Sequence, residues 1–461
     1  MKTVRPANGD RTSTHPSGYP DDAGHLFRVR RDVVSDLAEL PYVTRDVEIV
    51  GRDSMSGIRT INRPEVQLLL CCAQTTQDPV REDRIGALLR REIDWTYLLV
   101  TASRHGVAPL LYRSLNAADT KGVPQDVLEL LRERIYANSR RNLFLSGKLL
   151  EILDALEERE ISALPYKGPV LATAAYGNLG LREFSDLDLL LDDEDVLEAR
   201  EVLASLGYQP RDRMTGAQGA AFLRYERQYE FAHDDGTMVE LQWRVTPRYF
   251  SFPLDHEYVL ERSVPVALGG RTVQTFSPED LLLVLCVHGS VHCWSRLGWV
   301  CDIAELVRTS GEMDWERLVE RAGTFGGRRM LLLGLFLANH LLGLELEPYI
   351  VRQARSDKTV EALAKDVCER LLSEVPDPQG ILEGSAFRSF HFRVIEGSRG
   401  KLRYCAHRVA TPTLWERRLV PLPAVLFPFY RVLRPILLIG KFGSRLAKRA
   451  LLDHGESRVS R

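Results

Sequence analysis

The chain has 461 residues, which is enough to bury a large core and to form two or three structural units. Its residues are 44% hydrophobic and 27% charged, a composition typical of a soluble globular protein. The formal net charge of -2 gives no general reason to expect a nucleic acid as partner.

The cysteines and the N-terminal sequence indicate the compartment. Seven cysteines are scattered along the chain without a Cys-x-x-Cys pair, which argues against a disulfide framework and against a structural zinc site. The first 25 residues lack the apolar region of a signal peptide, and no uncharged apolar run reaches the ~18 residues of a membrane-spanning helix. We therefore expect a cytoplasmic protein.

The first two segments in chain order are an extension and a helical region. Residues 1–63 are rich in Arg, Asp, Ser, Thr, Gly and Pro without sustained periodicity, and we expect them to be disordered. In residues 64–160, apolar side chains recur at helical spacing. This pattern predicts a helix that starts at Pro64 and further helices over about 83–104 and 125–157.

Residues 161–250 change to a mixed pattern that predicts a small α/β core. Short apolar or alternating runs predict strands over 161–166, 185–191, 228–232 and 238–243. Pro169 is suited to the first turn of a helix that continues to Tyr176, and a second helix is expected over 192–206. The sequence His-Asp-Asp-Gly-Thr between the last two strands predicts a hairpin turn.

The rest of the chain is predicted to be helical up to about residue 400 and basic beyond it. In the segment 251–400, helices are expected over about 278–309, 314–325, 327–343 and 358–373. Residues 401–461 hold 13 Lys and Arg against 3 Asp and Glu, mixed with apolar runs. Such a segment can contact an anionic membrane surface or a partner, although we favour packing on the helical domain.

Two carboxylates stand one residue apart in the predicted strand 185–191. Asp186 and Asp188 point to the same side of the strand, while Leu187 and Leu189 point into the core. Glu240 lies in the second strand of the predicted hairpin and would join them if that strand pairs alongside. Close carboxylates repel unless a cation lies between them, and Mg²⁺ prefers oxygen ligands. The alternative is an ordinary solvated strand face.

These residues and their neighbours resemble a known family. The order strand, Gly turn, helix, Asp-x-Asp strand and later acidic strand resembles the polymerase-beta-like nucleotidyltransferase superfamily. The chain more closely resembles a bacterial family of uncharacterised nucleotidyltransferases over roughly residues 65 to 310. The motifs that carry this resemblance are Ile93-Asp94-Trp95, His105-Gly106-Val107, Lys167-Gly168, Arg182, Ser185 to Leu191, Gly207-Tyr208, Glu240 to Trp243, His288-Gly289, His292, Trp294, Trp299 and Asp302-Ile303-Ala304.

The resemblance implies a fold and an activity. The fold is α+β, with a small mixed-sheet nucleotidyltransferase core flanked by helical N- and C-terminal regions. The activity is transfer of a nucleoside monophosphate from an NTP to an acceptor hydroxyl. Two Mg²⁺ ions would be bound by Asp186, Asp188 and Glu240, with Glu240 also helping to activate the acceptor. The nucleotide phosphates would be contacted by Lys167, Gly168, Arg182 and Ser185.

Two departures from the superfamily pattern support another interpretation. Pro169 follows Gly168 where Gly or Ser is usual, and the 17 residues between Gly168 and Asp186 make a longer interval than is usual. These two departures favour a non-catalytic accessory protein that binds a nucleotide or a partner. A further difference is Gln242, where relatives often carry His. A third hypothesis is a zinc hydrolase built on His288 and His292, which are four residues apart as in zinc-binding helices.

Overall fold

The computed structural model describes residues 62–76, 78–117, 122–211, 227–250, 252–373, 384–410, 419–420, 429–430 and 432–437. These residues belong to a single unit, Met55–Arg461. The predicted N-terminal extension lies outside the described residues apart from its last two positions.

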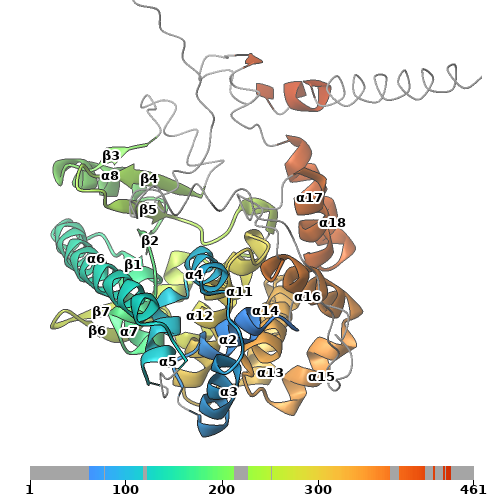
Figure 1. Ribbon diagram of the computed structural model, residues 1–461. Helices are drawn as coiled ribbons and strands as arrows, with labels where there is room; N and C mark the ends of the chain where they lie inside the picture. The colour runs from blue at the N-terminus through green and yellow to red at the C-terminus, as the bar shows by residue number, and fades with distance from the viewer. Residues whose placement is uncertain are drawn as a thin grey trace, which may run out of the picture. The chain divides into compact units, whose positions relative to one another are not determined.

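The N-terminal helical region contains five helices, and they confirm the helical prediction for it (Figure 1). They are α2 (Pro64–Cys72), α3 (Pro79–Leu89), α4 (Trp95–Arg104), α5 (Ala108–Ala117) and α6 (Gln125–Glu157). The predicted single helix over 83–104 is wrong, because α3 ends at Leu89 and a new helix begins at Trp95. The carboxylate of Asp94 caps that second helix by accepting a hydrogen bond of 2.9 Å from the backbone N–H of Tyr97.

A mixed five-stranded sheet forms the α/β core. Its strands lie in the order β1 (Leu164–Pro165), β2 (Asp186–Leu190), β5 (Met238–Gln242), β4 (Gln228–Ala232) and β3 (Gln209–Pro210). β2 and β5 pair in parallel and the other neighbours are antiparallel. Three predicted strands are confirmed with small differences at their ends, the first is only the two residues of β1 where 161–166 was expected, and β3 was not predicted. The predicted α+β fold with a small mixed sheet is therefore correct.

The two faces of this sheet have different roles. On one face, buried side chains such as Leu187, Val239 and Phe231 pack against α6 and α8 (Val196–Ser205). Because strand side chains alternate, Asp188 and Glu240 lie on the opposite face. The burial of the first face therefore fixes the direction of the acidic residues on the second.

The segment after the sheet contains a hairpin and eight helices among the described residues. The hairpin joins β6 (Val264–Leu268) and β7 (Arg271–Thr275) and was not predicted. The helices are α10 (His256–Glu261), α11 (Pro278–Val291), α12 (Leu297–Thr309), α13 (Trp315–Thr324), α14 (Arg328–Leu342), α15 (Pro348–Ser356), α16 (Lys358–Leu371) and α17 (Gly384–Val394). The prediction of one helix over 278–309 is wrong, because the chain turns between α11 and α12. α12 packs against α14 and also against α7 (Gly168–Tyr176) of the core.

The basic C-terminal segment is described in part. Helix α18 (Ser398–Ala410) lies at its start, and Leu402 on this helix is 72% exposed. Most residues beyond 410 lie outside the described residues, so contact of this segment with a membrane or a partner stays a prediction. No helix among the described residues is long and apolar enough to cross a membrane.

Candidate active site

The three predicted acidic residues lie on adjacent strands. In the parallel pairing of β2 with β5, Asp188 is directly opposite Glu240, and Asp186 is opposite Met238. Asp188 is only 4% exposed, whereas Asp186 and Glu240 are half-buried. The expected juxtaposition of the three carboxyl groups is thus present at the level of the strand register.

A glutamine connects two of these acids. The Nε2 of Gln242 donates hydrogen bonds of 2.8 Å to Oδ1 of Asp188 and of 2.8 Å to Oε2 of Glu240. The amide is itself held by Tyr166, whose hydroxyl donates to Oε1 of Gln242 at 2.7 Å. The ring of Tyr166 is fully buried and stacks on Phe276 with 4.7 Å between ring centroids. The Tyr166–Gln242 pair was not predicted as part of the site.

Lys167 directly precedes α7, and Gly168 is the first residue of that helix. The ammonium of Lys167 donates to Oδ1 of Asp188 at 3.1 Å. Gly168 has a φ of +52°, and a Cβ at this position would be 3.3 Å from the backbone carbonyl oxygen of Asp186. Glycine is therefore needed both for the left-handed conformation and for the close approach of the helix start to the acidic strand. Pro169, in the first turn of α7, has no N–H to offer a ligand.

The charges at this site act strongly on one another. Burial raises the pKa of Glu240 to about 8, and the neighbouring charges of Asp188 and Asp186 act in the same direction. Burial also raises the pKa of Asp186, again with a contribution from Asp188. Burial is the largest single effect on Lys167 and opposes its charge, but the combined attraction of Asp188, Tyr166, Glu240 and Asp186 outweighs it, so the pKa of Lys167 rises. The carboxylates therefore crowd together at a place where a bound cation would relieve their repulsion.

Arg182 is engaged by an aspartate of the helical domain. Its Nε and Nη2 donate to the two carboxylate oxygens of Asp302 at 2.7 Å and 3.0 Å. The hydroxyl of Tyr176 donates to the same carboxylate at 2.7 Å, and Asp302 is 2% exposed. The third guanidinium nitrogen, Nη1, is buried and has no hydrogen-bond partner within the described structure. Arg182 therefore joins the core to α12 and keeps one donor unused.

The loop before β2 is held by helix α6. The amide of the buried Asn142 donates to the carbonyl oxygens of Leu179 at 2.6 Å and of Arg182 at 2.8 Å. Ser185, predicted to contact phosphate, is exposed at the end of this loop. Asn142 was not predicted as a functional residue. A buried asparagine inside a long apolar helix face was the available signal.

His288 and His292 lie side by side without a set of metal ligands. Their ring centroids are 4.6 Å apart, and both rings contact Trp299. Within the described ranges, no group of three or more His, Cys, Asp or Glu side chains is arranged to hold a metal ion. This finding applies to the three acids of the sheet as well as to the two histidines. The nearby Cys293 is buried, and burial raises the pKa of its thiol to about 12. The two imidazoles thus have no third ligand among the described residues, and this does not support the zinc hypothesis.

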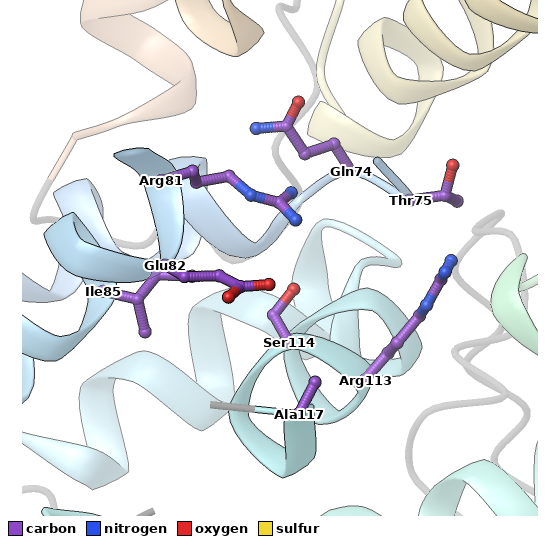
Figure 2. Close-up of a pocket in the computed structure, with 8 residues that line it drawn as sticks. All are labelled: Gln74, Thr75, Arg81, Glu82, Ile85, Arg113, Ser114 and Ala117. Atoms are coloured by element: carbon purple, nitrogen blue, oxygen red, sulfur yellow. The ribbon is translucent and has the colours of Figure 1, made fainter. Parts of the chain in front are cut away.

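The cavity in Figure 2 lies elsewhere, between α3, α5 and the loop that follows α2. It has a volume of about 20 Å³, which holds a single water molecule. Its lining residues are Gln74, Thr75, Arg81, Glu82, Ile85, Arg113, Ser114 and Ala117. None of them belongs to the predicted site, so this cavity is not a candidate for substrate binding.

Comparison with known proteins places the chain in a family. The solved structures that it resembles include the solution structure of the antibiotic-resistance factor ANT(2'')-Ia, with a TM-score of 0.30, 16% identity, and coverage of 40% of this chain and 92% of that one. The lincosamide antibiotic adenylyltransferase LnuA gives a TM-score of 0.27 and 16% identity over 36% of this chain and 97% of that one. An antigenic nucleotidyltransferase-like protein from Paracoccidioides brasiliensis gives a TM-score of 0.29 and 18% identity over 47% of this chain and 98% of that one. No curated protein matches the chain. The family model described as "Uncharacterised nucleotidyltransferase" matches residues 91–343, more than half of the chain, and the protein therefore belongs to this nucleotidyltransferase family.

Proposed function

We propose that the protein transfers a nucleoside monophosphate from an NTP to a hydroxyl group of an acceptor, with Mg²⁺ held by Asp186, Asp188 and Glu240. The observation that carries this proposal is the placement of these three acids on the paired strands β2 and β5, beside the N-terminus of α7. A helix N-terminus favours phosphate because its free N–H groups and its dipole attract negative charge. Membership of the family supports nucleotidyl transfer in general.

The residues present are chemically suited to Mg²⁺. All three are carboxylates, which are hard oxygen ligands, and they come from one sheet face. When bound, the metal ions neutralise charge on the triphosphate and favour the deprotonated form of the acceptor hydroxyl. In the described structure Asp188 is instead held by Lys167 and Gln242, and the three acids are not arranged as ligands of one ion, so metal binding would require the ammonium of Lys167 to move away.

The chain's own groups would then act as follows. The acceptor oxygen forms a bond to the α-phosphorus, and the bond from that phosphorus to the bridging oxygen breaks, so that pyrophosphate leaves with the electron pair. The proton of the acceptor hydroxyl passes to the carboxylate of Glu240. Lys167 and the unused Nη1 of Arg182 supply positive charge for the phosphate oxygens.

The accessory-protein hypothesis has a specific observation in its favour. Both cations expected to contact phosphate are bound to carboxylates: Lys167 to Asp188, and Arg182 to Asp302. Pro169 further removes one N–H from the first turn of α7. A protein that only binds a nucleotide or partner would tolerate this arrangement better than an enzyme would.

The test measures NTP binding and transfer with and without Mg²⁺ for the wild type and for the double variant Asp186→Asn/Asp188→Asn. Asp193→Asn is the matched control, because Asp193 is an exposed acid shortly after β2. We expect a loss of at least roughly 100-fold in transfer for the double variant only. NTP binding that is independent of Mg²⁺ and unchanged in the double variant would contradict the metal mechanism and favour the accessory role.

A further inference from the structure

Large apolar side chains are exposed on α17, on α18 and on the described residues that follow them, at the red end of the chain in Figure 1. Fifteen such side chains are exposed among the described residues, and seven of these lie from Phe392 onward, although the described residues there are a small part of the chain. Single exposed apolar residues are normal, but a concentration of them marks a contact surface. Three of the seven lie on α17 and α18: Phe392, Leu402 and Val409.

The outer side of α18 combines apolar and basic side chains. Leu402 and Val409 are 72% and 46% exposed, and their spacing of seven residues places them on one side of the helix. Arg399, three residues before Leu402, and Arg403, directly after it, are exposed as well. On the other side of the helix, Tyr404 is only 4% exposed and packs into the main core. The helix is therefore anchored by one side and presents a basic and apolar stripe on the other.

A groove joins this stripe to α17 and to the start of α16. It has a volume of about 370 Å³, and its lining holds four cations and no acid. The cations are Arg329, Lys358, Arg393 and Lys401. The ammonium of Lys401, on α18, lies 5.1 Å from the ring centroid of Phe392, on α17, and this ring is 42% exposed. The groove therefore places positive charge beside an exposed apolar ring.

Acidic side chains offset only part of this charge. Arg329 pairs with Asp357 at 2.7 Å, and Arg393 pairs with Asp366. Across α17 and α18, residues 384–410, the sequence has six Lys and Arg against one Glu, a formal charge of +5 in a chain whose formal net charge is -2. The cations of the groove and stripe that form no ion pair within the described part of the chain are Lys358, Arg399, Lys401 and Arg403.

The mixture of charge and apolar surface distinguishes between possible occupants. A second copy of the chain would bring the same positive charge to this surface and would be repelled. A nucleic acid would pair with the cations but would leave Leu402 and Val409 in water. The surface of an anionic membrane satisfies both features, because its phosphates attract Lys and Arg while the acyl boundary beneath them accepts apolar side chains.

We propose that the outer stripe of α18 and the adjoining groove bind the surface of a membrane that contains anionic phospholipids. Leu402 and Val409 enter the acyl boundary, Arg399 and Arg403 meet the headgroups, and a lipid phosphate occupies the groove beside Lys358. This surface shares no residue with the three acids of the sheet or with the groups that hold them. The proposal is therefore independent of the proposed nucleotidyl transfer and concerns the place where the protein acts.

The test is sedimentation of the full chain with vesicles of phosphatidylcholine, with and without about 30% phosphatidylglycerol. We expect binding to the anionic vesicles only, and weaker binding as the salt concentration rises, because salt screens the charges. Arg399→Gln/Arg403→Gln should weaken binding by about 30-fold, the equivalent of about 1 kcal/mol for each cation, and Lys358→Gln should weaken it by about 5-fold. Leu402→Gln should weaken it by about 10-fold, because the leucine no longer enters the acyl boundary.

Helix α6 supplies the matched controls. Leu143→Gln replaces a leucine that is 66% exposed, and Arg132→Gln/Arg140→Gln removes two exposed arginines, so these variants change the same residue types on another surface. They should bind the anionic vesicles as the wild type does, and thermal unfolding shows that each variant is folded.

Four results would overturn the inference. They are absence of binding to the anionic vesicles, equal binding to vesicles of phosphatidylcholine alone, equal losses in the α6 and α18 variants, and tighter binding of a single-stranded oligonucleotide that the α18 variants lose. Nucleotidyl transfer in solution should be unchanged in the α18 variants. A failure of vesicle binding with transfer retained would therefore refute this inference alone, whereas vesicle binding without transfer would refute only the proposed function.

Discussion

Gln242 should position the two carboxylates that it joins, and replacing it with leucine tests this role. The side chain is completely buried and donates to both Asp188 and Glu240. A hydrogen bond to a charged group contributes about 1.5–3 kcal/mol, and a buried acceptor left unpaired costs a comparable amount. Gln242→Leu should therefore destabilise the protein by about 3 kcal/mol in the absence of metal.

The same substitution should lower kcat more than it raises the KM for the NTP, because Gln242 is fully buried and its amide contacts Asp188, Glu240 and Tyr166. Tyr166→Phe is the comparison, since it removes the single hydroxyl that holds the amide and should cost about 1 kcal/mol. The two effects should be less than additive in the double variant, because Tyr166 and Gln242 belong to one network.

Thermal unfolding in a chelating buffer and steady-state kinetics with Mg²⁺ measure these effects. A melting temperature of Gln242→Leu within 1 °C of the wild type, as a rough threshold, would refute the energetic argument, because a loss of about 3 kcal/mol lowers it by several degrees. Additive effects of the two substitutions would refute the coupling between Tyr166 and Gln242.

Three further substitutions test other parts of the structure. Gly168→Ala should lower the free energy of unfolding by about 1 kcal/mol or more beyond the loss caused by Gly177→Ala. Both glycines have a positive φ, but only Gly168 has a backbone atom close to the added Cβ, so equal losses would contradict the close approach. Arg182→Met should destabilise the protein by about 3–5 kcal/mol, because it removes the cation paired with the buried carboxylate of Asp302. Arg159→Met removes an exposed ion pair and should cost less than about 1 kcal/mol, and chemical denaturation compares the two variants. Burial lowers the pKa of His105 to about 3, so between about pH 6.5 and 3 the unfolded chain binds a proton that the folded chain does not. The stability should therefore fall as the pH falls through this window, by up to about 1.4 kcal/mol per pH unit. His105→Gln should show a shallower dependence of stability on pH, and an unchanged slope would contradict the burial argument.

Local patterns in the sequence were sufficient to predict four of the five strands of the sheet and the direction of its acids. The alternation in 185–191 identified Asp186 and Asp188 as neighbours on one face, and the Asp-Gly turn identified the hairpin that contains Glu240. The parallel pairing of β2 with β5 then brought these residues together. Each of these inferences depends on residues close to one another in the chain.

The breaks between helices were harder to predict. The turn after α11 places Cys293 and Trp294 in the left-handed region, with φ of 53° and 56°, which residues of these types rarely adopt. Trp294 is 1% exposed, so its burial holds a turn that local preference opposes. The hairpin of β6 and β7 does carry a readable local signal, because Gly269-Gly270 stands between two alternating segments.

The partners of the site residues could not be predicted, because they come from distant parts of the chain. Tyr166 and Gln242 are 76 residues apart, and Arg182 and Asp302 are 120 residues apart. Periodicity and turn preferences carry no information about such pairs. The sequence therefore identified the acids but not the polar groups that hold them.

The contact between Lys167 and Asp188 leads to an expectation about the order of binding. Lys167 cannot donate fully to a phosphate while its ammonium lies 3.1 Å from Asp188, and the metal-free acids lose their nearby positive charge if it moves away. A metal ion that takes the place of the ammonium at Asp188 would free Lys167 for the nucleotide. Binding of Mg²⁺ and of NTP should then be cooperative, and by thermodynamic linkage each should increase the affinity of the other by the same factor.

Calorimetric titration measures this coupling. The Kd of an NTP should be several-fold lower with Mg²⁺ than in a chelating buffer. This decrease in Kd should be larger for the wild type than for Lys167→Met, in which no ammonium has to be released. If the wild type and Lys167→Met show the same dependence on Mg²⁺, the release of Lys167 does not connect the two ligands. In that case the lysine acts only to neutralise the buried carboxylates, and its pairing with Asp188 would favour the accessory-protein hypothesis.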